Sequence, residues 1–121
     1  MSAHGPGDAR RHHGGLAAED AALAAYEARG ARLLARRWRV AEGEIDLVLE
    51  AAGVTVFVEV KARARIGADS PIGPRQKARL AAAATRWLAE HPTPACRFDA
   101  ALVDRSGRVA ILEHALSFDG D

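Results

Sequence analysis

The sequence predicts an α/β fold in which a central mixed β-sheet is flanked by helices. Three observations support this prediction: an alanine-rich helical segment near the N-terminus, two alternating apolar segments joined by a short turn, and an amphipathic helix followed by two further strand-like segments. The predicted order is therefore helix, three strands, helix, two strands. This order leaves two arrangements open, with a helix on each face of the sheet or both helices near one face.

The chain of 121 residues is long enough for one domain with a single core. Apolar residues make up 49% and charged residues 27%, and no apolar run reaches the length of a membrane span, so we expect a water-soluble globular protein without membrane contacts. Residues 1–13 are rich in Gly, His and Arg and are predicted to form a disordered tail before a domain at 14–121. The N-terminus lacks the apolar centre of a secretory signal, and a lone Cys96 cannot form an internal disulfide, so we expect a cytoplasmic location.

The first helix is predicted from Leu16 to Arg29, where Gly30 suits the left-handed position that ends a helix. One face of this helix carries residues at three- and four-residue spacing, namely Leu16, Glu19, Leu23 and Tyr26. Glu19 is therefore predicted to lie within an apolar stripe, which favours a role in positioning a metal or a water molecule.

Three strands are predicted next, at 31–39, 44–50 and 53–63. The arginines of the first strand favour an edge position in the sheet. In the second strand Ile45, Leu47 and Leu49 are expected to share one side, with Asp46 and Val48 on the other. Ala51-Ala52-Gly53 is predicted to turn the second strand into the third, which makes the two strands a β-hairpin.

The second half of the chain begins with a breaker-rich loop at 64–73 and a helix from about Pro74 to Glu90. The inner face of this helix is predicted to carry Gln76, Leu80, Ala83 and Trp87. Strands are predicted at 97–103 and 108–114, joined by a turn at 104–107.

Two charged residues interrupt the apolar run of the third strand. Alternation places its valines on one face and Phe57, Glu59 and Lys61 on the other. Burying an unpaired charge costs several kcal/mol, so Glu59 and Lys61 must neutralise each other or serve a ligand. The first alternative is a structural ion pair at the end of a strand.

Asp46 favours the second alternative. The predicted hairpin register places Asp46 opposite Phe57 and diagonal to Glu59, about 7 Å away between side-chain roots. Two carboxylates at this separation are suitable ligands for Mg²⁺ or Mn²⁺, and the backbone carbonyl of Val60 is a further candidate. Lys61 is then placed to orient an attacking water or to stabilise charge on a phosphate, which is the chemistry of phosphodiester hydrolysis.

The motif GEID at 43–46 with FVEVKAR at 57–63 resembles the core of the PD-(D/E)XK nuclease superfamily. Across 14–118 the chain is similar to the small bacterial YraN family of predicted nucleases, which itself resembles archaeal Holliday-junction resolvases. The matching features are Gly15, Glu19, Arg39 to Leu47, VFVEVKAR, Lys77 and RFD at 97–99. The sequence departs from the family pattern at Pro74, next to the start of the second helix.

This resemblance implies a restriction-endonuclease-like fold and a metal-dependent endonuclease acting on DNA. The similarity to Holliday-junction resolvases further favours branched DNA as the substrate and a homodimer. The implied catalytic residues are Asp46, Glu59, Lys61, Glu19 and Gln76, and the implied metal ligands are Asp46, Glu59 and Val60. Clustered basic side chains are the expected DNA contacts, namely Arg37, Arg39, Arg63, Arg65, Arg75 and Lys77. The chain contains 15 arginines and two lysines, and both lysines occupy motif positions.

Three questions stay open at this level. The protein could be a non-catalytic nucleic-acid-binding or interaction module that keeps the nuclease fold. Asp99 fits equally well as a partner of an arginine and as a member of the site. Trp38, in the arginine-rich edge strand, suits either a subunit contact or a cap on the core.

Overall fold

The computed structural model describes residues 6–62 and 73–116, and their side chains from 15 to 62 and from 73 to 115. The elements follow the predicted order of helix, three strands, helix and two strands, which is confirmed. In chain order they are α1 (Pro6–Ala28), β1 (Arg32–Val40), β2 (Gly43–Ala51), β3 (Val54–Ala62), α2 (Pro74–Glu90), β4 (Cys96–Val103) and β5 (Val109–Leu116).

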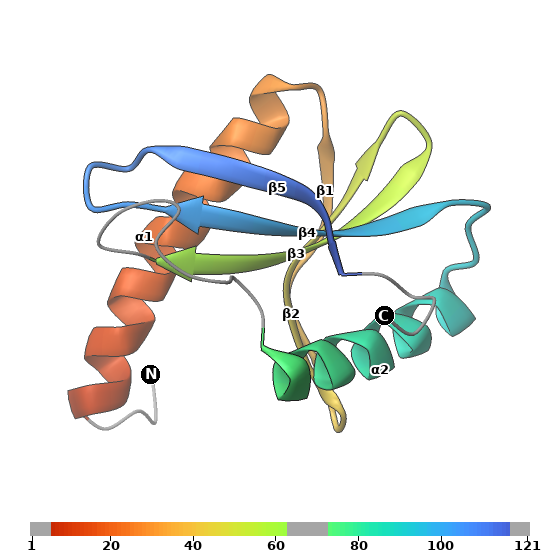
Figure 1. The fold of residues 1–121 in the computed structure, drawn as a ribbon, viewed down its shortest axis with the longest axis horizontal. Coiled ribbons are helices and arrows are strands. Elements are labelled where there is room, and N and C mark those ends of the chain that lie inside the picture. Colours follow the sequence, from red (N-terminus) through yellow and green to blue (C-terminus); the bar gives the residue numbers. More distant parts are fainter. Residues whose placement is uncertain (1–5, 63–72, 117–121) are drawn as a thin grey trace.

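The five strands form one mixed sheet in the order β1-β2-β3-β4-β5 (Figure 1). β3 and β4 run parallel, whereas the other neighbours run antiparallel. A parallel pair needs a crossover connection, and the segment between β3 and β4 contains α2. The predicted mixed sheet and the edge position of β1 are both confirmed.

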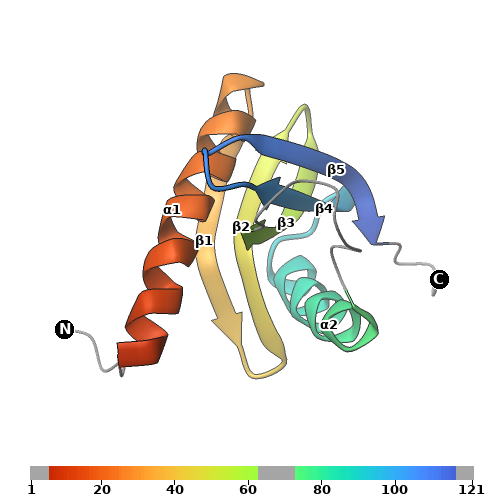
Figure 2. The same ribbon diagram turned by 60° about the vertical axis from the view of Figure 1, so that its left-hand side comes forward.

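The two helices cover opposite faces of the sheet (Figure 2), which settles the arrangement that the sequence left open. On one face Ala18, Ala22 and Tyr26 of α1 pack against the leucines and valines of β2 and β3. On the other face Leu80 and Trp87 of α2 pack against a cluster that includes Phe57 and Phe98. As predicted, the valines of β3 face one way, and Phe57, Glu59 and Lys61 face the other.

Helix α1 differs from its prediction in extent and in its buried face. It begins at Pro6 instead of Leu16, so its backbone includes most of the segment predicted to be a tail, while residues 1–5 lie outside the described residues. Leu16 was expected on the inner face but is 39% exposed, and the alanines Ala18 and Ala22 are buried instead. Small side chains let the helix approach the sheet closely. Within the described residues, neither helix has the length and apolar character needed to cross a bilayer.

The predicted register of the β2–β3 hairpin was wrong by two positions. Val48, and not Asp46, pairs with Phe57, and the ladder runs from Leu47–Val58 to Ala51–Val54. The turn consists of Ala52 and Gly53, both with positive φ (53° and 83°), which is typical of a tight two-residue hairpin turn. A shift of two residues leaves every side chain on its original face, because side chains alternate with a period of two. Asp46 and Glu59 are therefore neighbours, as predicted, despite the wrong register.

The β1–β2 hairpin bends where Arg37 adopts a positive φ of 54°. Below the bend Ile45 contacts the cluster under α2, whereas Leu47 and Leu49 contact the cluster under α1, so the predicted common face of these three residues is wrong. The tip of the hairpin lies beside α2 (Figure 2), where Glu42 contacts Arg79 and Arg86. At Gly43 a Cβ would lie 3.0 Å from the carbonyl oxygen of Arg79, which explains the glycine at this close approach.

Candidate functional site

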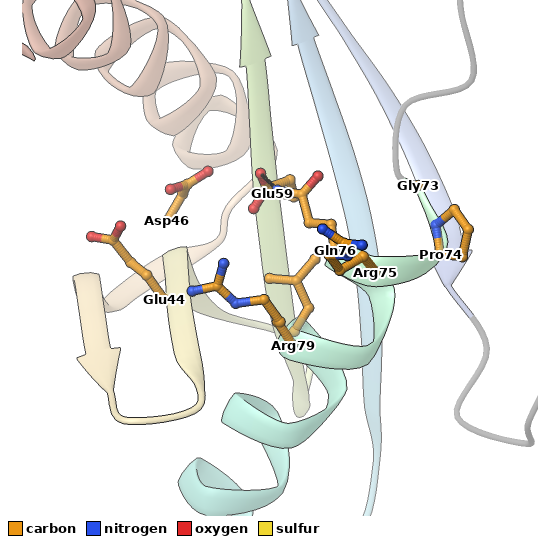
Figure 3. Close-up of a pocket in the computed structure, with 9 residues that line it drawn as sticks. Glu44, Asp46, Glu59, Gly73, Pro74, Arg75, Gln76 and Arg79 are labelled. Carbon is orange, nitrogen blue, oxygen red and sulfur yellow. Dashed lines mark hydrogen bonds between the residues drawn. The ribbon is translucent and has the colours of Figure 1, made fainter.

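A pocket of about 530 Å³ lies between the bent β2, the end of β3 and the first turns of α2 (Figure 3). Its walls combine acidic side chains from the strands with basic and polar side chains from the helix. The lining residues are Glu44, Asp46, Glu59, Gly73, Pro74, Arg75, Gln76, Arg79 and Leu80. The positive end of the α2 dipole therefore faces this pocket.

Asp46 and Glu59 form the acidic centre of the pocket. The ladder between β2 and β3 ends at Leu47–Val58, one step short of this pair, and so brings the two carboxylates closer than predicted. Asp46 Oδ2 accepts a hydrogen bond of 2.8 Å from the backbone N–H of Val60. Glu59 is only 7% exposed. Asp46 is half-buried, so the two neighbouring acids have little contact with solvent.

Burial perturbs both acids, and repulsion from Glu59 adds to the shift of Asp46. The pKa of Asp46 is raised from 3.8 to about 8, first by burial and then by the nearby charge of Glu59, and the Val60 N–H only partly offsets this. The pKa of Glu59 is also raised by burial, although Lys61 and hydrogen bonds from Asp46 and Gln76 oppose the shift. A site that holds two buried carboxylates with incomplete neutralisation favours either a shared proton or a cation.

Lys61 and Gln76 complete the centre. The Lys61 Nζ donates to Gln76 Oε1 at 2.7 Å, and the Gln76 Nε2 donates to Glu59 Oε2. The ammonium lies 3.4 Å from the same Glu59 oxygen. The ion pair that the sequence allowed is therefore present, but it belongs to a larger group that includes Asp46 and Gln76. Pro74 opens α2 at the predicted position, and the helix aims Gln76 into the site.

Glu19 approaches the site from α1 and is 3% exposed, as its predicted inward direction requires. Its carboxylate accepts hydrogen bonds from Arg37 Nε at 3.0 Å and Arg36 Nε at 3.2 Å. Its charge contributes to the raised pKa of Asp46, which shows that the two acids are near one another. In this structure Glu19 therefore holds arginines at the border of the site.

The donor set of the pocket fits a hard divalent cation. Mg²⁺ commonly uses one or two carboxylates and completes its coordination with waters and substrate phosphates. Asp46 and Glu59 provide two carboxylates, and burial raises the pKa of both, so a bound cation would stabilise their ionised forms. Within 6–62 and 73–116, no group of three or more His, Cys, Asp or Glu residues is arranged to hold a metal ion. Any cation here would therefore take its remaining ligands from the backbone, from waters or from substrate.

The predicted DNA-binding residues fall into different environments. Arg75 is exposed and lines the pocket, whereas Arg37 is bonded to Glu19. Arg39 is 69% exposed and lies 3.4 Å from Glu44. Lys77 is half-buried on α2. The other two predicted contacts lie outside the described residues, namely Arg63 and Arg65.

Two charged pocket residues were not among the predicted site residues, namely Glu44 and Arg79, although Arg79 belongs to the cluster of basic residues at 61–79 in the sequence. Glu44 lies two positions before Asp46, so period-2 alternation would have placed both on one side. Arg79 lies three positions after Gln76, a spacing that puts neighbours on one helix face. Figure 3 shows Arg79 extending from α2 toward Glu44.

Asp99 lies on the opposite face of the sheet and takes no part in the pocket. Arg97 donates to both of its oxygens, at 3.0 and 3.2 Å, and the Tyr26 hydroxyl donates to Oδ2 at 2.8 Å. The backbone N–H of His114 adds a contact of 3.3 Å. Of the two predicted roles, Asp99 therefore has that of an arginine partner. Trp38 likewise has a core position in the monomer, with its ring edge-on to Trp87 at 5.2 Å.

Comparison with known proteins gives one consistent family. The family described as "Uncharacterised protein family UPF0102" matches residues 18–103. A UPF0102 protein of Ruegeria pomeroyi is 50% identical over 111 residues, which cover 88% of this chain and 89% of the relative. A UPF0102 protein of Azorhizobium caulinodans is 45% identical over 113 residues, covering 90% of this chain and 86% of the relative. A third, of Ralstonia nicotianae, is 50% identical over 99 residues, covering 74% and 76%.

Proposed function

This chain belongs to the UPF0102 family, and because that family is described only as uncharacterised, we propose a function from the site: a metal-dependent endonuclease that hydrolyses phosphodiester bonds in DNA. The observation that carries the proposal is the pair of Asp46 and Glu59, two neighbouring carboxylates that line a pocket beside Lys61 and whose pKa values are both raised by burial. Two neighbouring carboxylates lower the stability of the native state, and a bound cation would offset that loss. Perturbed acids of this kind are typical of functional sites.

Asp46 and Glu59 would hold a Mg²⁺ or Mn²⁺ ion, with the Val60 carbonyl as a further ligand. A divalent cation at such a site supplies Lewis acidity toward a phosphate oxygen and acidifies water near neutral pH. The Val60 N–H that bonds Asp46 Oδ2 fixes the orientation of this carboxylate. In this proposal the main contribution of the chain is therefore to orient the two carboxylates that would hold the cation.

Lys61 has the role of orienting the attacking water and stabilising negative charge on the phosphate. Gln76 fixes this ammonium through its amide oxygen and fixes Glu59 through its amide nitrogen, so one side chain sets the distance between the carboxylate and the ammonium. Glu19 has a supporting role, because it holds Arg37 next to Asp46. A compact ammonium with rotatable donors suits this geometry better than a planar guanidinium.

The resemblance of GEID and FVEVKAR to the PD-(D/E)XK core supports the same proposal, and with it a restriction-endonuclease-like fold. The likeness to the YraN family and to resolvases supports branched DNA as the substrate. Symmetric cleavage of two strands needs two active sites, so a homodimer is a corollary of that substrate.

A second candidate function is a non-catalytic nucleic-acid-binding module. It is favoured by one observation: in the described part of the chain, no third His, Cys, Asp or Glu joins the acid pair in a metal-binding arrangement. Such a module would bind DNA with a steep salt dependence and would keep that binding after Glu59→Gln.

Cleavage of linear, flapped and four-way DNA in Mg²⁺ or Mn²⁺ tests the proposal. We expect wild-type protein to cut at least one form, EDTA to abolish cutting, and Asp46→Ala and Lys61→Ala to lose about 100-fold or more in rate, the range for a group that stabilises a transition state. Arg86→Ala is the matched control, since Arg86 pairs with Glu42 away from the pocket. Variants of Asp46 and Lys61 that cut as fast as wild type would place the active site elsewhere, and DNA binding without cutting would select the second candidate.

A further inference from the structure

We propose that Arg75 and Arg79 form a phosphate-binding subsite that holds the backbone of a nucleic-acid strand across the mouth of the pocket. The identity of the ligand rests on the proposed function, whereas the subsite itself is argued from the charges, exposure and spacing of residues on α2.

The charges of the pocket make such a subsite necessary for any phosphate ligand. Three carboxyl groups line it, from Glu44, Asp46 and Glu59, and each one that is ionised would repel an incoming phosphate. The cations among its described lining residues are Arg75 and Arg79. The adjacent Lys61 already donates to Gln76 and contacts Glu59, so its charge is largely committed.

These two guanidinium groups are also available. Both side chains are exposed, and among the described residues no carboxylate lies within ion-pair distance of either one. Arg79 makes one long contact, 3.4 Å from its Nε to the carbonyl oxygen of Glu42. Its two terminal NH₂ groups are left to bind a ligand. By contrast, Arg37 and Arg86 are each engaged by a glutamate.

The spacing of the pair suits a strand. Residues four apart lie on one helix face, about 6 Å apart along the axis, so both side chains can contact phosphates of the same strand. A guanidinium binds phosphate through two parallel hydrogen bonds, which adds orientation to charge. A strand bound to Arg75 and Arg79 would lie at the pocket that Glu59 also lines.

The test is the salt dependence of DNA binding, measured with a short labelled oligonucleotide in EDTA so that no cleavage occurs. The slope of log K against log salt is negative, and Arg75→Ala and Arg79→Ala should each reduce its magnitude by about 0.7 for single-stranded and about 0.9 for duplex DNA. Arg86→Ala, on the same helix but paired with Glu42, should leave the slope unchanged. Arg75→Lys and Arg79→Lys keep the charge and should keep the slope.

A slope for both alanine variants equal to that of Arg86→Ala would overturn the subsite, as would the absence of DNA binding by the wild type. The result is independent of cleavage. If the slopes decrease in magnitude but the wild type cuts no DNA, the subsite stands and the nuclease proposal fails. If the wild type cuts DNA but the slopes do not change, only the subsite fails.

Discussion

Two aspartates on opposite faces of the sheet, one fully buried and one half-buried, show how differently the same side chain can be used. Asp99, under α1, is fully buried and receives hydrogen bonds from Arg97, Tyr26 and the His114 N–H. Asp46, on the side of α2, receives one N–H and lies beside another carboxylate, which raises its pKa to about 8. The first arrangement stabilises the fold, and the second costs stability unless a proton or a cation is present. Acids that a fold leaves unsatisfied are candidates for function, whereas those it satisfies are structural.

Asp99→Asn should produce the largest loss of stability. The substitution removes the charge that pairs with Arg97, which is 17% exposed and would keep only the longer contact of 3.5 Å to the more exposed Glu113. Breaking a buried ion pair in this way costs about 3–5 kcal/mol. Urea unfolding would measure it. A loss below about 1 kcal/mol would show that Asp99 is no more structural than a surface residue.

The pH dependence of stability should come mainly from Asp46. Since its pKa is about 8 in the native state and its ordinary value, expected in the unfolded chain, is 3.8, the native state keeps a proton that the unfolded state releases between these pH values. Stability should therefore fall as pH rises from about 4 to about 8. Each pKa unit corresponds to about 1.4 kcal/mol and solvent screens part of it, so we expect a loss of about 2–4 kcal/mol in EDTA.

Asp46→Asn is the control for that experiment. It should remove most of the slope over this pH window and make the metal-free protein as stable as the wild type, or more stable, at pH 8. A variant with the same slope as wild type, or one destabilised throughout, would mean that Asp46 is satisfied in solution much as Asp99 is.

Metal should stabilise the wild type through the acid pair. At 100 times its dissociation constant a ligand that binds only the native state adds about 2.7 kcal/mol, so the melting temperature should rise in steps with Mg²⁺ or Mn²⁺ concentration. Asp46→Asn should lose the response, while Asp99→Asn should keep it from a lower starting temperature. If the wild type melts at the same temperature across all metal concentrations, the metal site is wrong.

Tyr26→Phe should give the smallest effect and sharpen the contrast. It removes a single neutral donor, the hydroxyl that lies 2.8 Å from Asp99 Oδ2, and leaves Arg97 and the His114 N–H in place. One hydrogen bond to a charged acceptor contributes about 1.5–3 kcal/mol, and the remaining donors should hold the loss near the lower end. Thermal unfolding at pH 7 would measure it; a loss as large as that of Asp99→Asn would make the hydroxyl the dominant partner.

Much of the site was predictable from the sequence because strand alternation is local. The faces of Glu59 and Lys61 follow from period-2 geometry along β3, and the inward direction of Gln76 follows from helical spacing along α2. The same reasoning would have recovered Glu44. The order of the elements, the mixed sheet and the edge position of β1 also follow from patterns within short segments.

The tertiary structure decided what depends on pairing and bending. The two-residue turn at Ala52-Gly53 set the register that brings Asp46 to Glu59, and the bend at Arg37 moved Ile45 to the other core and opened the pocket. Packing also determined which acids are neutralised, since Glu19 of α1 meets arginines of β1 and Asp99 keeps Arg97 of its own strand, whereas Asp46 meets a carboxylate. Periodicity assigns a side chain to a face, but its charge environment depends on residues distant in the chain, which only the packed fold brings within a few ångströms.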